Sequence, residues 1–359
     1  MLDYASTAET TPNIAVIKYW GKRDEKLILP HNSSMSFTMS EVLKTRTTVV
    51  FSKDFTEDSA WIQHEKLEGQ ELYGLLRIIN LIRERYSINL KAHIASLNCF
   101  PTASSASGMA ALVCAATKAL RLNLSPKELS ILARQGSGSA SRSVMGGFVE
   151  WRRGVEPDGS DSFAEQIKPA SHWSEMRNVI ALVDQGRKKV SSRSGMRQTI
   201  ETSPLYRARL DYLPEALEKM RQAVTAKNFE DFAEITMRES DNMHAVMLDT
   251  WPPITYLNDV SRQIMHTVRE DLNIGETRAA YTFDAGPNAH VYTLEKHAET
   301  VKKALKEIPG VQQVLECKVG DGPKYIEDES DYLIDPESGE MRDHFFDEAS
   351  KKIVVGRQI

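Results

Sequence analysis

Apolar and polar residues follow different patterns in two parts of the chain, and the change falls near residue 204. Before it, short runs rich in β-branched and aromatic residues alternate with helical patterns, whereas helical spacing dominates 204–240 and 254–273. The pattern predicts strands at 14–20, 45–52, 91–96, 148–151, 178–183 and 311–318, and a strand–turn–strand unit at 279–294. It predicts further helices at 70–87, 125–135 and 296–308, and one inside 99–121. The helix-rich part is a candidate second lobe.

Three stretches lack a clear periodicity. Residues 21–40 are punctuated by Gly21 and Pro30 and alternate serine with larger side chains at 33–39, which predicts a hairpin. Residues 152–175 are polar and predict a surface loop. The acidic, polar residues from 320 to 359 predict a tail that either lies on the surface or is partly disordered.

The stretch Cys99–Arg121 leads from a proline turn through a serine cluster into a long apolar helix. Ser104, Ser105 and Ser107 can cap this helix with their hydroxyls. The first N–H groups of a helix have no partner inside it and carry the positive end of its dipole, so they can also bind a phosphate. The stretch alone leaves both a phosphate site and a capped core helix open.

A second segment rich in glycine and serine, at 136–151, carries Arg142. Glycine and serine let a backbone fold around an anion and offer N–H and O–H donors, and an arginine can bind a phosphate or carboxylate with two hydrogen bonds. A flexible loop is the alternative interpretation. The apolar strand predicted at 148–151 anchors the segment at that end.

Other basic residues have two interpretations each. Lys18, Lys22 and Arg23 lie beside Tyr19 and Trp20, where a solvated basic turn is the simpler explanation. Four more lie in a serine-rich stretch that is either a loop near a nucleotide or an exposed connector: Lys188, Lys189, Arg193 and Arg197. The predicted helix 70–87 carries Arg77, Arg83 and Arg85, which are solvated charges unless one of them points into a cleft, where it could clamp an anion.

Asp284 opens the turn of the strand–turn–strand unit at 279–294. An aspartate in a turn usually bonds neighbouring backbone N–H groups. Its functional use would be as a carboxylate at a strand end, near a phosphate site.

The composition, with 41% hydrophobic and 26% charged residues among 359, is that of an ordinary globular enzyme. The net charge of −5 argues against a general nucleic-acid-binding surface. Cys99, Cys114 and Cys317 have no C-x-x-C spacing, and the nine histidines form no zinc motif, which indicates a reducing compartment without disulfides or structural zinc. No secretory signal and no membrane-spanning run are visible, so we predict a cytoplasmic protein that binds neither nucleic acid nor membrane.

Three segments together carry a family resemblance that none carries alone. They are NIAVIKYWGKRD at 13–24, GSGSASRSVMGGFVEW at 136–151 and YTFDAGPNAH at 281–290. In this combination the chain resembles the diphosphomevalonate decarboxylase family of the GHMP kinase superfamily. Further stretches are similar to that family in the same order, at 29–40, 171–173, 194–205 and 248–258.

The resemblance implies an α+β, two-lobed GHMP-kinase-like fold with the active site in a deep cleft. It implies a ribosomal protein S5 domain 2-like N-terminal lobe at 1–190, a ferredoxin-like C-terminal lobe at 191–320 and a tail of unknown role at 321–359. The implied reaction is the ATP-dependent decarboxylation of (R)-5-diphosphomevalonate to isopentenyl diphosphate, ADP, phosphate and CO₂, in the mevalonate pathway to isoprenoids and sterols. ATP and Mg²⁺ are implied, with Mg²⁺ bound through ATP, and the implied assembly is a homodimer.

The chemistry of this reaction fits the residues. The substrate carries a diphosphate and a carboxylate and therefore needs lysine and arginine side chains. A tertiary hydroxyl is a poor leaving group, so ATP is consumed to convert it into a phosphate ester. Departure of that phosphate develops positive charge at carbon, and rigidly held groups must keep the carboxylate ready to fragment.

Matching positions carry the family's roles over to this sequence. Asp284 resembles the general base that takes the 3-hydroxyl proton, and Arg142 and Lys18 are the other catalytic candidates. The resemblance implies substrate contacts at Tyr19, Trp20, Gly21, Lys22, Arg77, Ser137, Gly138, Ser139, Ala140, Ser141, Arg142 and Thr199. It implies ATP contacts at Ser104, Ser105 and Lys188.

One segment departs from the family's pattern. The family's phosphate loop reads like PTAAGLASSAAG, whereas PTASSASG at 101–108 lacks the Ala-Gly-Leu-Ala portion with its glycine. Either the loop is shortened and ATP binding is altered, or the sequence omits residues; the intact remainder of the site favours omission. The alternatives to a decarboxylase are a mevalonate-type kinase that stops after phosphorylation and a non-catalytic binding protein.

Overall fold

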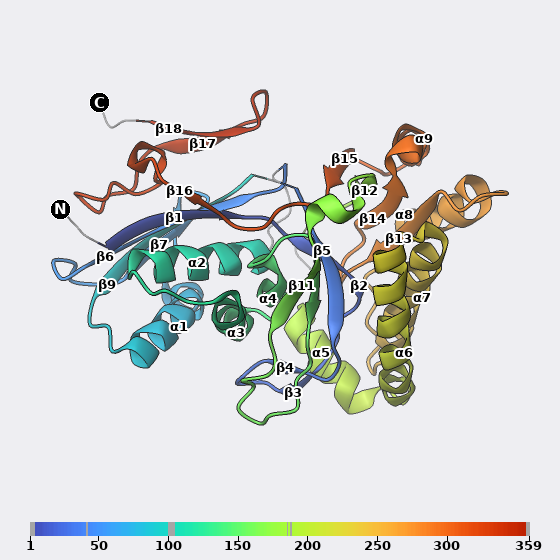
Figure 1. Cartoon of the computed structure of the whole chain (residues 1–359), viewed down its shortest axis with the longest axis horizontal. Coiled ribbons are helices and arrows are strands. Elements are labelled where there is room, and N and C mark those ends of the chain that lie inside the picture. The colour runs from blue at the N-terminus through green and yellow to red at the C-terminus, as the bar shows by residue number, and fades with distance from the viewer. Residues whose placement is uncertain (1–3, 41, 100–104, 185, 187–188, 357–359) are drawn as a thin grey trace.

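The largest sheet of the protein has six strands in the order β16-β1-β6-β9-β7-β8 (Figure 1). The computed structural model describes residues 4–40, 42–99, 105–184, 186 and 189–356. The six strands are β1 (Tyr4–Thr10), β6 (Thr45–Ser52), β7 (Ser59–Ile62), β8 (Glu65–Lys66), β9 (Lys91–Asn98) and β16 (Lys324–Ile326). Neighbouring strands are antiparallel, except that β7 runs parallel to β9.

Three helices cover one face of this sheet: α1 (Gly69–Tyr86), α2 (Ser105–Ala119) and α3 (Pro126–Gly136). The alanine-rich α2 packs directly on β1 and β6, because its small side chains allow a close approach. The sequence also explains where α3 begins. The Ser125 hydroxyl accepts the backbone N–H of Glu128, whose carboxylate accepts the N–H of Ser125, and Pro126 fills the first helical position.

A second sheet has the order β11-β10-β5-β2. Its strands are β2 (Asn13–Ile17), β5 (Ser34–Thr38), β10 (Phe148–Trp151) and β11 (Ala164–Lys168), and the short α4 (Ala140–Ser143) lies beside it. Strand β5 pairs with β2 on one side and with β10 on the other, so it is a central strand, and every one of its residues is buried. The hairpin predicted within 21–40 is confirmed only for β3 (Lys22–Asp24) and β4 (Leu29–Pro30).

The prediction of a surface loop at 152–175 is wrong for its second half. That half contains β11 and the 3₁₀-helix Ala170–Trp173. Ala164 and Trp173 are 1% and 3% exposed. Two buried anchors in an otherwise polar stretch produce no periodicity, so only the tertiary packing reveals them.

The third sheet, with the order β13-β14-β12-β15, builds the second lobe. Its strands are β12 (Met176–Leu182), β13 (Ala279–Phe283), β14 (Ala289–Leu294) and β15 (Gln313–Lys318). The helices of this part are α5 (Ser192–Thr202), α6 (Leu205–Ala226), α7 (Phe229–Leu248), α8 (Asp259–His266), the π-helix Thr267–Leu272 and α9 (Glu295–Lys306). Since β12 pairs with β14 and β15, a division at residue 190 cuts this sheet, and a division before Met176 keeps it whole.

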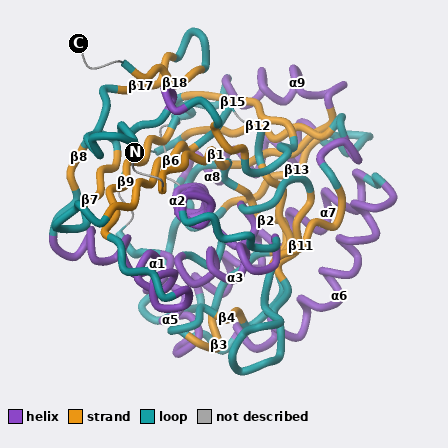
Figure 2. The backbone as a smooth tube through the Cα atoms, turned by 60° about the vertical axis from the view of Figure 1, so that its left-hand side comes forward, coloured by secondary structure: helices purple, strands orange, loops and turns teal. Residues whose placement is uncertain are grey.

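An aromatic cluster joins the two lobes. The ring of Phe37 on β5 lies 4.5 Å from Phe148 of β10, 5.4 Å from Phe232 of α7 and 4.8 Å from Tyr292 of β14, measured between centroids. Figure 2 shows α6 and α7 along the margin of the second lobe. The predicted α+β architecture of two lobes is therefore confirmed, with a shared core at their junction.

The C-terminal segment, residues 327–356, packs on one face of the six-stranded sheet, and α2 packs on the opposite face (Figure 1). Successive strand residues point to opposite faces, so Val49 faces the helices while Val50 faces this segment. Leu333 and Ile334 are 0% exposed, and the segment ends in a hairpin of β17 (His344–Asp347) and β18 (Lys352–Val355). The prediction of a tail on the surface fits its many exposed residues, but it missed the anchors that bury this segment against the sheet.

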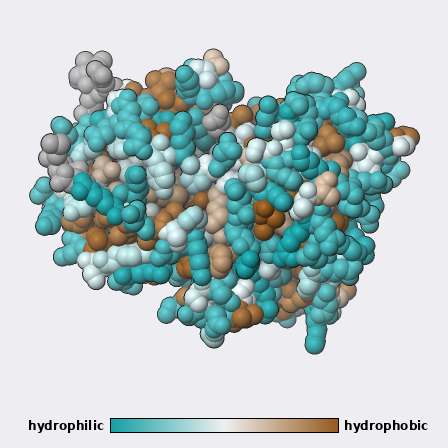
Figure 3. All heavy atoms as spheres, viewed as in Figure 1, coloured by the Kyte–Doolittle hydropathy of each residue, from teal (hydrophilic) through white to brown (hydrophobic). Residues whose placement is uncertain are grey.

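The surface shown in Figure 3 is mostly hydrophilic, and its hydrophobic side chains form small groups. Among the residues that the structure describes, none of the helices has the length and apolar character needed to cross a bilayer.

Replacing Leu333 with alanine tests whether the C-terminal segment belongs to the core. We expect Leu333→Ala to lower the free energy of unfolding by about 2–5 kcal/mol, because it leaves a cavity at a fully buried position. Phe345→Ala, at a side chain 57% exposed in the same segment, is the control. Urea unfolding measures both, and equal small losses would show that the segment does not stabilise the fold.

Candidate active site

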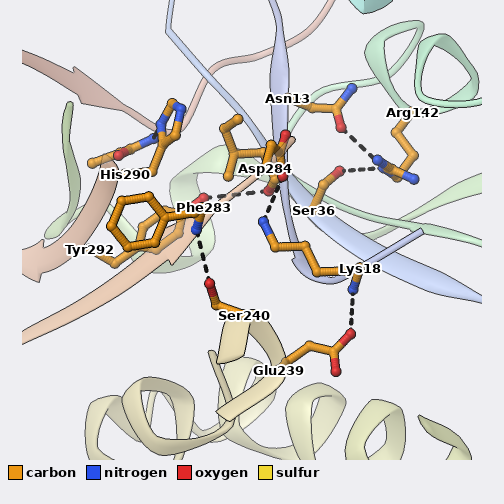
Figure 4. Close-up of polar contacts among 12 residues, drawn as sticks. Asn13, Lys18, Ser36, Arg142, Glu239, Ser240, Phe283, Asp284, His290 and Tyr292 are labelled. Atoms are coloured by element: carbon orange, nitrogen blue, oxygen red, sulfur yellow. Dashed lines mark hydrogen bonds and ion pairs between the residues drawn. The ribbon is translucent and has the colours of Figure 1, made fainter. Parts of the chain in front are cut away.

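The site is organised around an ion pair between two strand ends. Lys18 follows β2, Asp284 follows β13, and the Nζ of Lys18 lies 2.6 Å from Oδ1 of Asp284 (Figure 4). The side chain of Lys18 is 1% exposed, whereas that of Asp284 is 51% exposed. The lysine is therefore enclosed by protein, and the carboxylate remains open to a ligand.

Burial controls the charges around this pair. It lowers the pKa of Lys18, and the Asp284 carboxylate opposes that shift. Burial also lowers the pKa values of His244 and His290 to about 4, so both imidazoles are neutral at physiological pH. Around Asp284 the positive charge consequently comes from Lys18 and Arg142.

Arg142, on α4, is held by neutral oxygen atoms. Its Nε donates to Oδ1 of Asn13 and Oγ of Ser36, each at 3.0 Å, and its Nη1 donates to Oγ of Ser34 at 2.7 Å. Burial lowers its pKa to about 10, which still leaves it charged at neutral pH. Within the described part of the chain it forms no ion pair. A buried cation with only neutral partners favours an anionic ligand.

The loop before α4 approaches the aromatic residues closely. A Cβ on Gly138 would lie 2.8 Å from the ring of Tyr19 and 3.0 Å from that of Trp151, so only glycine fits there. Ser137 and Ser139, on either side of Gly138, are partly exposed. Ala140 and Ser141 are 0% exposed, and the Ser141 hydroxyl donates to the carbonyl of Gly138 at 2.7 Å. These last two residues shape the loop from inside.

The segment after Lys18 is held by buried contacts. Nε1 of Trp20 donates to Oγ1 of Thr199 at 3.0 Å, and Thr199 is 0% exposed. Gly21 has φ +129°, and a Cβ there would lie 1.8 Å from the hydroxyl of Tyr206. Nζ of Lys22 is paired with Glu25 at 2.5 Å. The structure thus gives Trp20, Gly21 and Thr199 positions from which they support the site rather than line an open surface.

Two arginines from distant helices meet at the end of α3. Nη2 of Arg77 donates to the carbonyl of Gln135 at 2.6 Å, and Nη2 of Arg193, on α5, donates to that of Gly136 at 3.2 Å. The pKa of Arg77 is lowered by burial and then by the charge of Arg193. The sequence left Arg193 between two interpretations, and only the fold brings it to the Gly138 loop.

Sequence reasoning missed the neutral partners of Arg142. Asn13 lies inside the resembling segment 13–24 without an assigned role, and Ser34 and Ser36 belong to the stretch 29–40. The alternating serines of 33–39 were the available signal, because a polar side chain on an otherwise buried strand needs a partner.

The structure describes one of the three candidate ATP contacts, Ser105. Ser104 and Lys188 lie outside the described residues. Ser105 begins α2 and is exposed, and the first turn of α2 holds no acidic residue. A Cβ on Gly108 would meet nothing within 4 Å. The start of a helix favours negative charge, so this end of α2 is compatible with the predicted phosphate contact. No group of three or more His, Cys, Asp or Glu that could hold a metal occurs in the described part.

Two family models match the chain. The diphosphomevalonate decarboxylase-like N-terminal domain covers residues 10–164, and the mevalonate 5-diphosphate decarboxylase C-terminal domain covers residues 178–319. The diphosphomevalonate decarboxylase of Homo sapiens is 40% identical over 385 aligned positions, which cover 93% of this chain and 96% of the human one. The alignment has more positions than the 359 residues of this chain, so it places gaps in this chain.

Solved structures agree with the sequence matches. The crystal structure of mevalonate diphosphate decarboxylase from Staphylococcus aureus superposes with a TM-score of 0.85 at 37% identity and covers 90% of this chain and 98% of that one. The structure of MDDEF in complex with MVAPP, AMPPCP and magnesium gives a TM-score of 0.84 at 38% identity and covers 90% and 99%.

The fold and its solved relatives define an ATP-dependent enzyme of the GHMP kinase superfamily, and the pair of Lys18 and Asp284 lies at the junction of its two lobes. Within that superfamily, the chain belongs to the diphosphomevalonate decarboxylase family. It is an ATP-dependent decarboxylase of the mevalonate pathway, and the resemblance read from 13–24, 136–151 and 281–290 is confirmed.

The neutral histidines behind Asp284 predict a pH-dependent stability. An unfolded histidine binds a proton below about pH 6.5, whereas folded His290 does so only below about pH 4. Its contribution to stability is therefore full above pH 6.5 and is lost as the pH falls toward 4. We expect His290→Gln to reduce the difference in unfolding free energy between pH 7 and pH 5 by about 1–2 kcal/mol.

Urea unfolding at the two pH values measures this difference, and His64→Gln, at an exposed position, is the control. An unchanged pH difference in His290→Gln would show that this imidazole is not held neutral.

Proposed function

We propose that this chain converts mevalonate 5-diphosphate and ATP into isopentenyl diphosphate, ADP, phosphate and CO₂, with Asp284, Lys18 and Arg142 as its catalytic residues. The observation that carries the proposal is the half-exposed Asp284 carboxylate held by a buried lysine, close enough to Arg142 for their charges to interact. Such a site offers a proton acceptor and a cation for an anionic substrate close to each other.

Asp284 is the proton acceptor for the 3-hydroxyl group. As the 3-oxygen forms its bond to the γ-phosphorus of ATP, the bond from that phosphorus to ADP breaks, and the hydroxyl proton passes to the Asp284 carboxylate. The bond from Lys18 at 2.6 Å limits the orientations that this carboxylate can adopt. A positioned base of this kind accounts for about 10²- to 10⁴-fold of a rate.

Arg142 binds the negative charge of the substrate, either its carboxylate or a phosphate. Its three neutral partners set the plane of the guanidinium without neutralising it. A carboxylate held there lies ready to lose CO₂ as the 3-phosphate departs and positive charge develops at carbon. Arg77 and Arg193, gathered at the end of α3, supply further charge for the diphosphate.

The start of α2 at Ser105 is the site for the nucleotide phosphates, together with Ser104 and Lys188. Mg-ATP supplies the phosphoryl group that turns the tertiary hydroxyl into a leaving group. The complex of MDDEF with MVAPP, AMPPCP and magnesium supports this assignment of ligands. The remaining contacts are Tyr19, Lys22 and the Ser137–Ser139 loop on the substrate.

We further propose that the protein acts in the cytoplasm as a homodimer. The three cysteines are free and buried, which suits a reducing compartment. The dimer is the assembly that the family resemblance implies. Sedimentation at several protein concentrations tests the dimer, and a monomer at all of them would contradict it.

Replacing Asp284 with asparagine tests the base. We expect Asp284→Asn to fold, since the side chain is half exposed and its amide oxygen can still accept the Lys18 ammonium, and to lose about 10²- to 10⁴-fold in turnover, because an amide cannot take the proton. A coupled assay follows ADP and CO₂ together, with Asp158→Asn on an exposed turn as the control. Wild-type turnover in Asp284→Asn would remove Asp284 from the mechanism.

The wild-type assay separates the competing functions. Equal release of ADP and CO₂ supports the decarboxylase. ADP without CO₂ would show a kinase that stops after phosphorylation. The absence of both products would show that the short loop at 101–108 has abolished turnover.

A further inference from the structure

A fully buried ion pair lies directly behind the segment that carries Lys18. The side chains of Arg209, on α6, and Glu239, on α7, are both 0% exposed. Nη2 of Arg209 donates to Oε1 of Glu239 at 2.6 Å, and Nη1 donates to Oε2 at 3.0 Å. Desolvating two charges costs free energy that their attraction only partly offsets, so a buried pair is weak evidence for stability. Its contacts indicate what else it does.

Both members of the pair bond the backbone of Lys18. The N–H of Lys18 donates to Oε1 of Glu239 at 2.8 Å, and the carbonyl of Lys18 accepts a weak hydrogen bond from Nη2 of Arg209 at 3.5 Å. Because β2 ends at Ile17, the peptide groups of Lys18 have left the sheet and need other partners. Glu239 supplies the partner of the N–H, while the carbonyl accepts a hydrogen bond from Nδ2 of Asn32 at 3.0 Å besides the longer one from Arg209.

Strand β2 is irregular just before Lys18. The register between β2 and β5 shifts between Ala15 and Ile17. Such a bulge redirects the side chains beyond it. Figure 4 shows Lys18 with its backbone toward Glu239 and its ammonium toward Asp284. The direction of this side chain thus depends on α7, an element of the other lobe.

We propose that Arg209 and Glu239 are a positioning pair for the phosphorylation step, which holds the backbone of Lys18 so that its ammonium meets Asp284. This inference rests on the proposed function, because it assigns the pair a role in that reaction. The pair acts through Lys18. The position of the Asp284 carboxylate therefore depends on how α6 and α7 pack.

The pair also affects the charge on Lys18. Burial lowers the pKa of Lys18, the carboxylates of Asp284 and Glu239 oppose that shift, and Arg142 adds to it. Loss of the Glu239 charge therefore lowers this pKa further, and the alkaline limb of activity moves to lower pH. The other titratable or charged side chains close to Lys18 are His244, His290 and Arg209.

The experiment compares Glu239→Gln and the double variant Arg209→Met/Glu239→Leu with a control on the same helix. Arg221 of α6 also bonds the first lobe, through Glu150 of β10, with side chains 36% and 3% exposed. Both pair variants are expected to lose about 10- to 100-fold in kcat, because the reacting groups are misplaced. KM for mevalonate 5-diphosphate should change little, and Arg221→Met should keep wild-type kcat.

The pH profile of kcat separates positioning from stability. We expect the alkaline limb of Glu239→Gln to lie at lower pH than that of the wild type and of Arg221→Met. Unchanged kcat and an unchanged limb in both pair variants would overturn the proposal, even if their unfolding free energies fall, because the pair would then be only structural.

Amide hydrogen exchange of Lys18 gives a readout that does not depend on turnover. The double variant should exchange this amide faster than Arg221→Met, since leucine cannot accept its N–H. Wild-type protection in the double variant would overturn the proposal. If the wild type releases no ADP from mevalonate 5-diphosphate and Mg-ATP, the proposed function fails. The exchange comparison would still show whether the pair holds Lys18.

Discussion

A lysine ammonium enclosed at the end of a strand is the constraint on which the rest of the site depends. A buried charge that lacks hydrogen bonds and an opposite charge costs much free energy, and the chain brings opposite charge to Lys18. It does so twice, with Asp284 on the ammonium and Glu239 on the backbone N–H. These contacts require that the end of β2, the end of β13 and the middle of α7 lie together, and this is the arrangement that the aromatic cluster around Phe37 stabilises.

Arg142 is also a buried cation, but its partners inside the protein differ from those of Lys18. Lys18 has a carboxylate partner inside the protein, whereas Arg142 has the amide oxygen of Asn13 and two serine hydroxyls. Neutral oxygens accept its hydrogen bonds without neutralising it, and Asp284 acts on its charge without forming an ion pair with it. The site therefore contains one cation that orients a protein group and one that remains available to a negatively charged substrate.

The six-stranded sheet shows how the scaffold keeps the helix start at Ser105 in place. One face of the sheet binds the alanine-rich α2, and the other is covered by the C-terminal segment through Leu333 and Ile334. Strands β1 and β6, on which α2 packs, are therefore shielded from water on both faces. The C-terminal segment thus completes the packing of the sheet against which α2 lies.

The sequence by itself determined the family and the candidate reacting groups, because local chemistry marks them. A glycine- and serine-rich loop with one arginine, a lysine beside aromatic residues and an aspartate in a strand turn are visible as patterns, and in combination they identify the family. The start of α3 was likewise predictable from Ser125, Pro126 and Glu128. Only the tertiary structure decided which groups meet. The partner of Lys18 lies 266 positions away, and Arg209 and Glu239 look like ordinary helix charges until the fold buries them. Strand β11, the packing of the C-terminal segment and the place of β12 in the second lobe follow from long-range contacts that no local period encodes.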